Sequence, residues 1–101
     1  MIRHIVMFEL LDEANGKTKS ENLELAARKA EELRTKIPSL LSYTVAVNSP
    51  DADSTNYDIA LICDFENMKG LEEYQNHPDH KEFGKFIVSV RKSRACIDIN
   101  I

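Results

Sequence analysis

Apolar and polar residues alternate along four stretches of the chain, which is the pattern of half-buried β-strands. These stretches are residues 2–10, 41–48, 57–65 and 94–101. One side of the first stretch carries Ile2, His4, Val6, Phe8 and Leu10. Its other side is also apolar, at Ile5 and Met7. Since both sides bear apolar groups, we expect both faces of this strand to be covered.

Two further regions repeat their apolar residues with the period of a helix. The first begins at Thr18, which has capping-box spacing to Glu21, and ends before Pro38. Its apolar stripe is Leu23, Ala26, Ala27, Ala30, Leu33 and Ile37. Because the middle of this stripe is alanine, the helix either lies close to its sheet or leaves space for a pocket. The sequence leaves both open.

The second helical region follows Asn67, a residue that caps helices well, and Pro78 interrupts it. A short helix with Leu71 and Tyr74 therefore precedes a second helical piece. That piece carries Phe83, Phe86, Ile87 and Val90. The intervening segments, residues 12–17 and 49–56, have the composition of turns and loops.

The order of these elements predicts an α+β ferredoxin-like protomer with βαββαβ topology. A chain of 101 residues forms one domain, residues 1–101, and the first strand lies between the third and fourth of a four-stranded antiparallel sheet. Helices would cover one face only. The other face would expose Ile5, Met7, Ala60, Ile62, Ile97 and Ile99. We therefore expect a homodimer through the open sheet face, closed into a dimeric α/β barrel.

Composition excludes several classes of function. The net charge is -4, which argues against a nucleic-acid partner, since binding phosphate requires clustered basic residues. No apolar run is long enough to cross a membrane, and the start of the chain lacks the pattern of a signal peptide, so we expect no membrane partner and a cytoplasmic location. Cys63 and Cys96 would lie two strand spacings apart, about 9–10 Å, too far for a disulfide.

The greatest potential for acid–base chemistry lies around the helical corner at Pro78. The side chains that could take part are those of Tyr74, His77 and His80. A histidine has an unperturbed pKa of about 6.5, which suits a general base near neutral pH. A proline corner also holds His80 more firmly than a mobile loop would. A metal site using His77 and His80 is a weaker hypothesis because their spacing matches no zinc motif, so we predict neither metal nor cofactor.

Four segments together resemble the stress-responsive dimeric α/β-barrel (Dabb) family over nearly the whole chain. They are His4-Ile5-Val6-Met7-Phe8, Ile37-Pro38, Tyr57-Asp58-Ile59-Ala60-Leu61 and Tyr74-Gln75-Asn76-His77-Pro78-Asp79-His80. The resemblance implies a ferredoxin-like protomer, a barrel dimer, and a small-molecule cavity between the sheet and the helices. One plant member of the family is a polyketide cyclase that performs an aldol condensation without cofactor or metal.

By this resemblance, His80 and Tyr74 would form an acid–base pair, His4 would line the cavity, and Asp98 would support His80. The implied ligand-binding residues are Val6, Phe8, Leu61, Phe83 and Gly84, with Ala27 and Ala30 where the plant enzyme has aromatic residues. Arg91 and Arg94 replace apolar lining positions, which argues against the same polyketide substrate.

Two functional hypotheses remain open. The first is a cofactor-independent cyclase or lyase of the aldol type. The second is a non-catalytic ligand-binding or stress-protective dimer. Under the second, His4 is a hydrogen-bonded core residue, His80 caps a helix or bonds the backbone, and Tyr74 belongs to the core.

Overall fold

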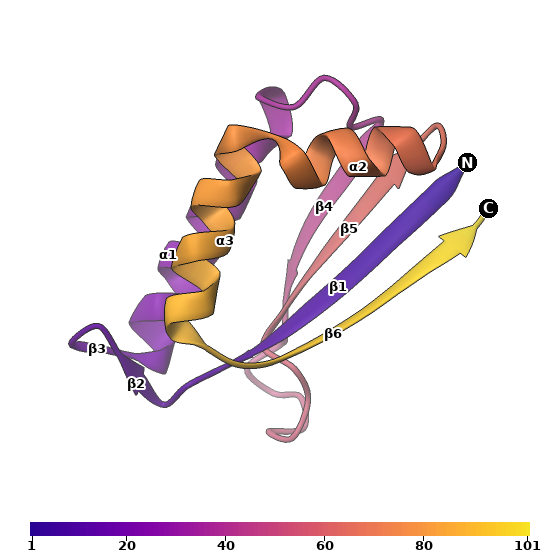
Figure 1. Ribbon diagram of the computed structural model, residues 1–101. Helices are drawn as coiled ribbons and strands as arrows, with labels where there is room; N and C mark the ends of the chain where they lie inside the picture. The colour runs from indigo at the N-terminus through magenta and orange to yellow at the C-terminus, as the bar shows by residue number, and fades with distance from the viewer.

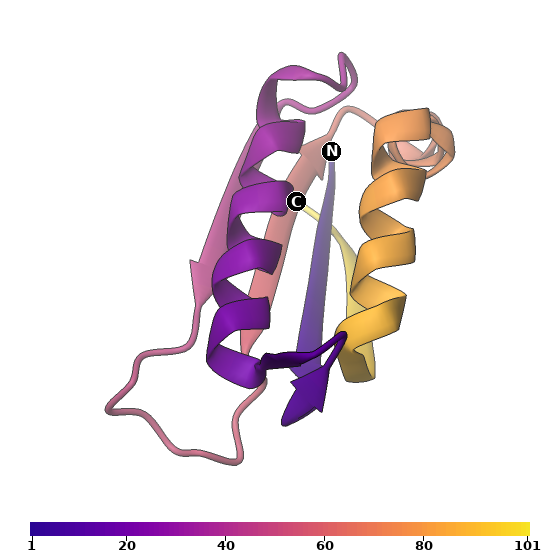
Figure 2. The same cartoon turned by 90° about the vertical axis from the view of Figure 1, so that its left-hand side faces the viewer.

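Four strands form one antiparallel sheet, and a computed structural model describes all 101 residues. The strands are β1 (Ile2–Leu10), β4 (Ser42–Val47), β5 (Ile59–Phe65) and β6 (Arg91–Asn100). Their order across the sheet is β4-β5-β1-β6, which confirms that the first strand lies between the third and fourth. Three helices, α1 (Lys19–Glu32), α2 (Met68–Asn76) and α3 (Pro78–Val90), cover one face, as predicted (Figures 1 and 2).

Helix starts lie where local sequence signals place them. Thr18 and Glu21 form a complete capping box at α1, and Asn67 accepts the Gly70 amide at α2. At the corner, His77 caps α3 through Nδ1, which accepts the Asp79 amide at 3.2 Å. Pro78 is the first residue of α3, where its missing N–H costs nothing.

Several boundaries differ from the prediction. Strand β5 begins at Ile59 rather than Tyr57, because the Asp58 carboxylate accepts the Leu10 amide. Strand β6 begins at Arg91 rather than Arg94, because α3 runs directly into it (Figure 1). The predicted turn over residues 12–17 is a small hairpin, β2 (Glu13–Ala14) and β3 (Lys17–Thr18). After α1 a 3₁₀ turn, η1 (Leu33–Thr35), continues the chain toward Ile37.

Helix α1 lies close to the sheet, which answers the question that its alanines raised. Ala26 and Ala30 are fully buried, and the Tyr43 hydroxyl from β4 donates to the Ala30 carbonyl at 2.9 Å. Leu23 and Ala27 are only partly buried. The small side chains of α1 therefore serve close packing.

The pairing of β6 with β1 contains a bulge. Ser93 lies opposite Glu9 and Arg91 lies opposite Leu10, so Lys92 is an extra residue on β6. Arg94 lies opposite Phe8. The extra residue changes which β6 side chains face the helices.

The face of the sheet without helices carries apolar residues between two ion pairs. Arg3 binds Asp64 through two hydrogen bonds of 2.8 and 3.0 Å on one side, and Lys92 lies 3.3 Å from Glu9 on the other. Between them Ile97 is 58% exposed and Met7 36% exposed. Both cysteines are free. None of the helices is long and apolar enough to span a bilayer.

Candidate functional site

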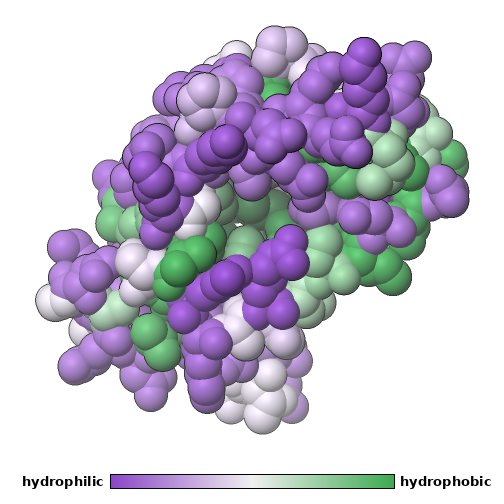
Figure 3. Space-filling view, viewed as in Figure 1, coloured by the Kyte–Doolittle hydropathy of each residue, from purple (hydrophilic) through white to green (hydrophobic).

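A cavity of about 130 Å³ lies between helices α2 and α3 and strands β1 and β6. In the space-filling view the surface is hollowed between the helices and β6, with apolar groups within and polar groups at the rim (Figure 3). The lining residues are His4, Val6, Phe8, Leu61, Tyr74, Gln75, His80, Phe83, Gly84, Ile87, Val88, Arg91 and Arg94.

His4 forms the shortest polar contact at this cavity. It is 3% exposed, and its Nδ1 donates to Asp98 Oδ1 at 2.6 Å. An ionised carboxylate only accepts, so Nδ1 carries a proton, and in a neutral ring the lone pair lies on Nε2. This is how a carboxylate fixes the tautomer of a general base.

The expected support of His80 by Asp98 is wrong, since Asp98 binds His4 instead. The two residues lie directly opposite each other in the antiparallel pair β1–β6. Opposite residues point to the same face of a sheet, so their side chains meet without any contribution from the helices. Strand register alone would have identified this pair.

His80 lies in the first turn of α3, immediately after the His77-Pro78 corner. Its ring centroid is 4.4 Å from that of Tyr74. Burial is the main cause of a lowered pKa for His80. A hydrogen bond with the Gln75 backbone opposes it, and electrostatic interaction with His4 and then Arg94 lowers the pKa further. A neutral imidazole therefore faces the cavity near pH 7.

Tyr74 connects the cavity to the core. It is 1% exposed, and its ring contacts His80 and, edge-on, His4 at a centroid distance of 6.3 Å. Its hydroxyl accepts a weak hydrogen bond from the Cys63 thiol at 3.9 Å. Burial raises the pKa of Tyr74 far above its ordinary value and that of Cys63 to about 12. The phenol thus keeps its proton, so Tyr74 can donate a hydrogen bond but cannot act as a phenolate base.

The predicted apolar lining is brought together in part. Five residues line the cavity as expected: Val6, Phe8, Leu61, Phe83 and Gly84. Ala27 and Ala30 do not line it, because α1 packs against the other half of the sheet and Ala30 is fully buried there.

The prediction missed Gln75, Ile87 and Val88 as lining residues. Ile87 could have been found from helical periodicity, since it follows His80 by seven positions and so shares its side of α3.

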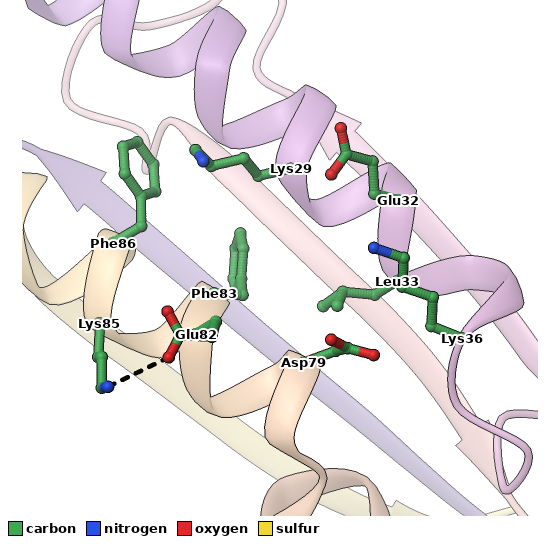
Figure 4. A pocket seen from close by; sticks show the side chains of 9 residues that line it. All are labelled: Lys29, Glu32, Leu33, Lys36, Asp79, Glu82, Phe83, Lys85 and Phe86. Carbon is green, nitrogen blue, oxygen red and sulfur yellow. Dashed lines mark hydrogen bonds and ion pairs between the residues drawn. The ribbon is translucent and has the colours of Figure 1, made fainter.

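A second groove separates α1 from α3 on the outside of the helical layer (Figure 4). It encloses about 370 Å³, and Phe83 belongs to its wall as well as to that of the cavity. Lys85 binds Glu82 at 3.1 Å across one side, and Lys29 lies 5.2 Å above the Phe86 ring. Basic and acidic groups alternate around this groove, so its charges favour neither an anionic nor a cationic ligand.

Three potential metal ligands meet beside the cavity. The ligand atoms of His4, Cys96 and Asp98 lie within 4.8 Å of one another. However, Nδ1 and Oδ1 are 2.6 Å apart, whereas two ligands of a tetrahedral zinc ion are separated by about 3.3 Å. The arrangement is that of a hydrogen-bonded pair. The predicted alternative with His77 and His80 gains no support, because His77 Nδ1 is occupied at the start of α3.

Residues 2–101 match the model of the stress responsive A/B barrel domain. The chain belongs to this family. In a search of curated proteins, none matches the sequence of this chain significantly.

Solved structures show the same fold. A dimeric protein of unknown function from Bacteroides fragilis is 29% identical, with a TM-score of 0.84 over 99% of this chain and 95% of that one. A dimeric ferredoxin-like protein of unknown function from Thermobifida fusca is 27% identical, with a TM-score of 0.82 over 99% and 90%. The hydroxynitrile lyase of Passiflora edulis is 14% identical, with a TM-score of 0.76 over 99% and 92%, a likeness of fold alone.

Proposed function

We propose that this A/B barrel domain binds a small carbonyl compound in the cavity and transfers a proton on it, as a cofactor-independent lyase or cyclase. The observation that carries the proposal is the pair of imidazoles, His4 and His80, that face one cavity while Asp98 orients the first. Two imidazoles that line one small cavity suit the removal and return of a proton on a bound ligand.

In this mechanism, neutral His80 removes a proton from the carbon next to the carbonyl. Negative charge then develops on the carbonyl oxygen and needs a hydrogen-bond donor. In this proposal Tyr74 supplies it, because its ring lies against that of His80 and burial keeps the phenol protonated. His4, held by Asp98, offers Nε2 as the second proton carrier. The Passiflora lyase supports the proposal only in that the same fold houses lyase chemistry.

Exchange of hydrogen for deuterium tests this step without the natural substrate. We expect the protein to accelerate exchange of the α-hydrogens of 2-pentanone in D₂O, followed by NMR. His80→Ala should slow the accelerated exchange by about 100-fold, the lower range for a general base, with a nearly unchanged melting temperature. His77→Asn is the matched control, since it removes a nearby imidazole and keeps a good helix cap. Equal exchange by wild type and His80→Ala would contradict the proposal.

Ligand binding without catalysis is the second candidate, and the position of the Tyr74 hydroxyl favours it. This hydroxyl lies within the core beside Cys63. A molecule that binds in the cavity without reacting would raise the melting temperature of the protein by mass action, and it would leave the cavity chemically unchanged. Under this candidate the ketone stabilises the protein, while its α-hydrogens exchange no faster than in buffer.

We also propose a homodimer through the open sheet face. The Bacteroides and Thermobifida proteins are described as dimeric. On this chain the open face exposes Met7 and Ile97. A mostly apolar hollow of about 510 Å³ beside Met7, Ala46 and Tyr57 offers a further contact surface. Covering such a patch with a second copy removes apolar area from water.

A further inference from the structure

We propose that the ligand of the cavity carries a carboxylate, bound by Arg91 and Arg94, so that the substrate is a short keto acid. The keto part of this assignment rests on the proposed function. The binding of a carboxylate rests on the two arginines alone.

The bulge in β6 is what places both arginines on the cavity. In a regular strand, residues three positions apart point to opposite faces of the sheet. Because Lys92 is the extra residue, Arg91 lies opposite Leu10 and Arg94 opposite Phe8, both of which face the helices. Lys92 instead reaches Glu9. Two guanidinium groups thus line one small cavity.

Neither guanidinium forms an ion pair with a carboxylate of the chain. Arg3 and Arg34, by contrast, bind Asp64 and Glu31. No acidic side chain lines the cavity, although the chain as a whole has a net charge of -4. A cavity whose only formal charges are two unpaired arginines favours an anion, and the guanidinium group matches the geometry of a carboxylate.

The surroundings of the arginines indicate the size and polarity of the remaining ligand. The cavity encloses about 130 Å³, which limits the ligand to a small molecule. Its walls include Val6, Phe8 and Ile87, which suit a short carbon chain. Arg94 and His80 line this same small cavity. An anion at the arginines would therefore place the keto group of the same short ligand near the imidazole.

Two probes of equal shape test the assignment. In NMR titrations, 4-oxopentanoate should bind at least about 10-fold more tightly than its neutral amide, 4-oxopentanamide. Arg94→Gln and Arg91→Gln should each weaken binding of the acid by about 10-fold and leave the amide unaffected. Added salt should weaken only the acid. Lys92→Gln, which removes one positive charge from the same strand outside the cavity, is the matched control.

Four results would overturn the inference. The first is that the wild-type protein shows no saturable binding of the acid, and the second is that acid and amide bind equally well. The third is that Lys92→Gln weakens binding of the acid as much as the arginine variants do. The fourth is that inorganic phosphate binds more tightly than the acid. A different result would refute the proposed function. Arginine-dependent binding without α-hydrogen exchange in either ketone would refute the proton transfer and retain the carboxylate site. If the protein accelerated exchange of 2-pentanone but bound the acid no more tightly than the amide, the carboxylate site would be refuted and the proton transfer retained.

Discussion

At the scale of single residues, the His4–Asp98 pair combines a buried ring with a partly exposed carboxylate. The side chain of His4 is 4% exposed and that of Asp98 36% exposed. Removing the carboxylate would leave the Nδ1–H group buried without its acceptor. We therefore expect Asp98→Ala to lower the free energy of unfolding by about 1–3 kcal/mol in urea titrations. Asn100→Ala, on the same side of β6 and exposed, should change it far less; equal losses would show that the hydrogen bond contributes nothing.

His80 gives stability a pH dependence whose sign follows from its environment. Its pKa is lowered in the folded protein, chiefly by burial, so the unfolded chain binds more protons as the pH falls below about 6.5. The contribution of His80 to the free energy of unfolding is therefore fully present above pH 6.5. It is lost as the pH falls from the pKa of His80 in the unfolded chain toward its lower pKa in the folded protein. The loss in urea midpoint below pH 6.5 should therefore be smaller in His80→Gln than in wild type. A larger loss in the variant would mean that the folded protein favours protonated His80.

At the scale of elements, the close packing of α1 on the sheet predicts different tolerance at neighbouring alanines. Ala30→Leu would force a larger side chain into a fully buried position and displace the Tyr43 hydroxyl. We expect a loss of about 1–3 kcal/mol in the free energy of unfolding. Ala27→Leu, at a partly buried position, should cost much less. If Ala30→Leu were neutral in urea titrations, there would be free space beneath α1.

Sequence patterns predicted those features of the elements that local residues determine. The capping box at Thr18 and Glu21 and the corner at Pro78 were found because each depends on residues a few positions apart. Alternation likewise identified the inward side of β1. The partner of Asp98 and the bulge at Lys92 were not found. Both depend on how β6 aligns with β1, a pairing that joins residues more than 80 positions apart, and the local pattern does not encode that register.

At the scale of the whole molecule, the two faces of the sheet have different tasks in our proposals. The helical face forms the cavity, and the open face contacts a second copy. Ile97 is 58% exposed on that open face. We expect Ile97→Lys to convert the dimer to a monomer in sedimentation experiments at micromolar concentration, because two charges would be buried across the two-fold axis. Met68→Lys is the control, at a similarly exposed apolar residue on α2. A wild-type protein that sediments as a monomer would refute the assembly.

The extra residue in β6 has a consequence for how such a protein diversifies. If β6 kept Lys92 but paired regularly, Lys92 would lie opposite Leu10, and the Arg91 guanidinium would turn from the chamber to the opposite side. Relatives could thus alter the electrostatics of the compartment by a change in the pairing of one strand, while every wall residue on the helices stays the same.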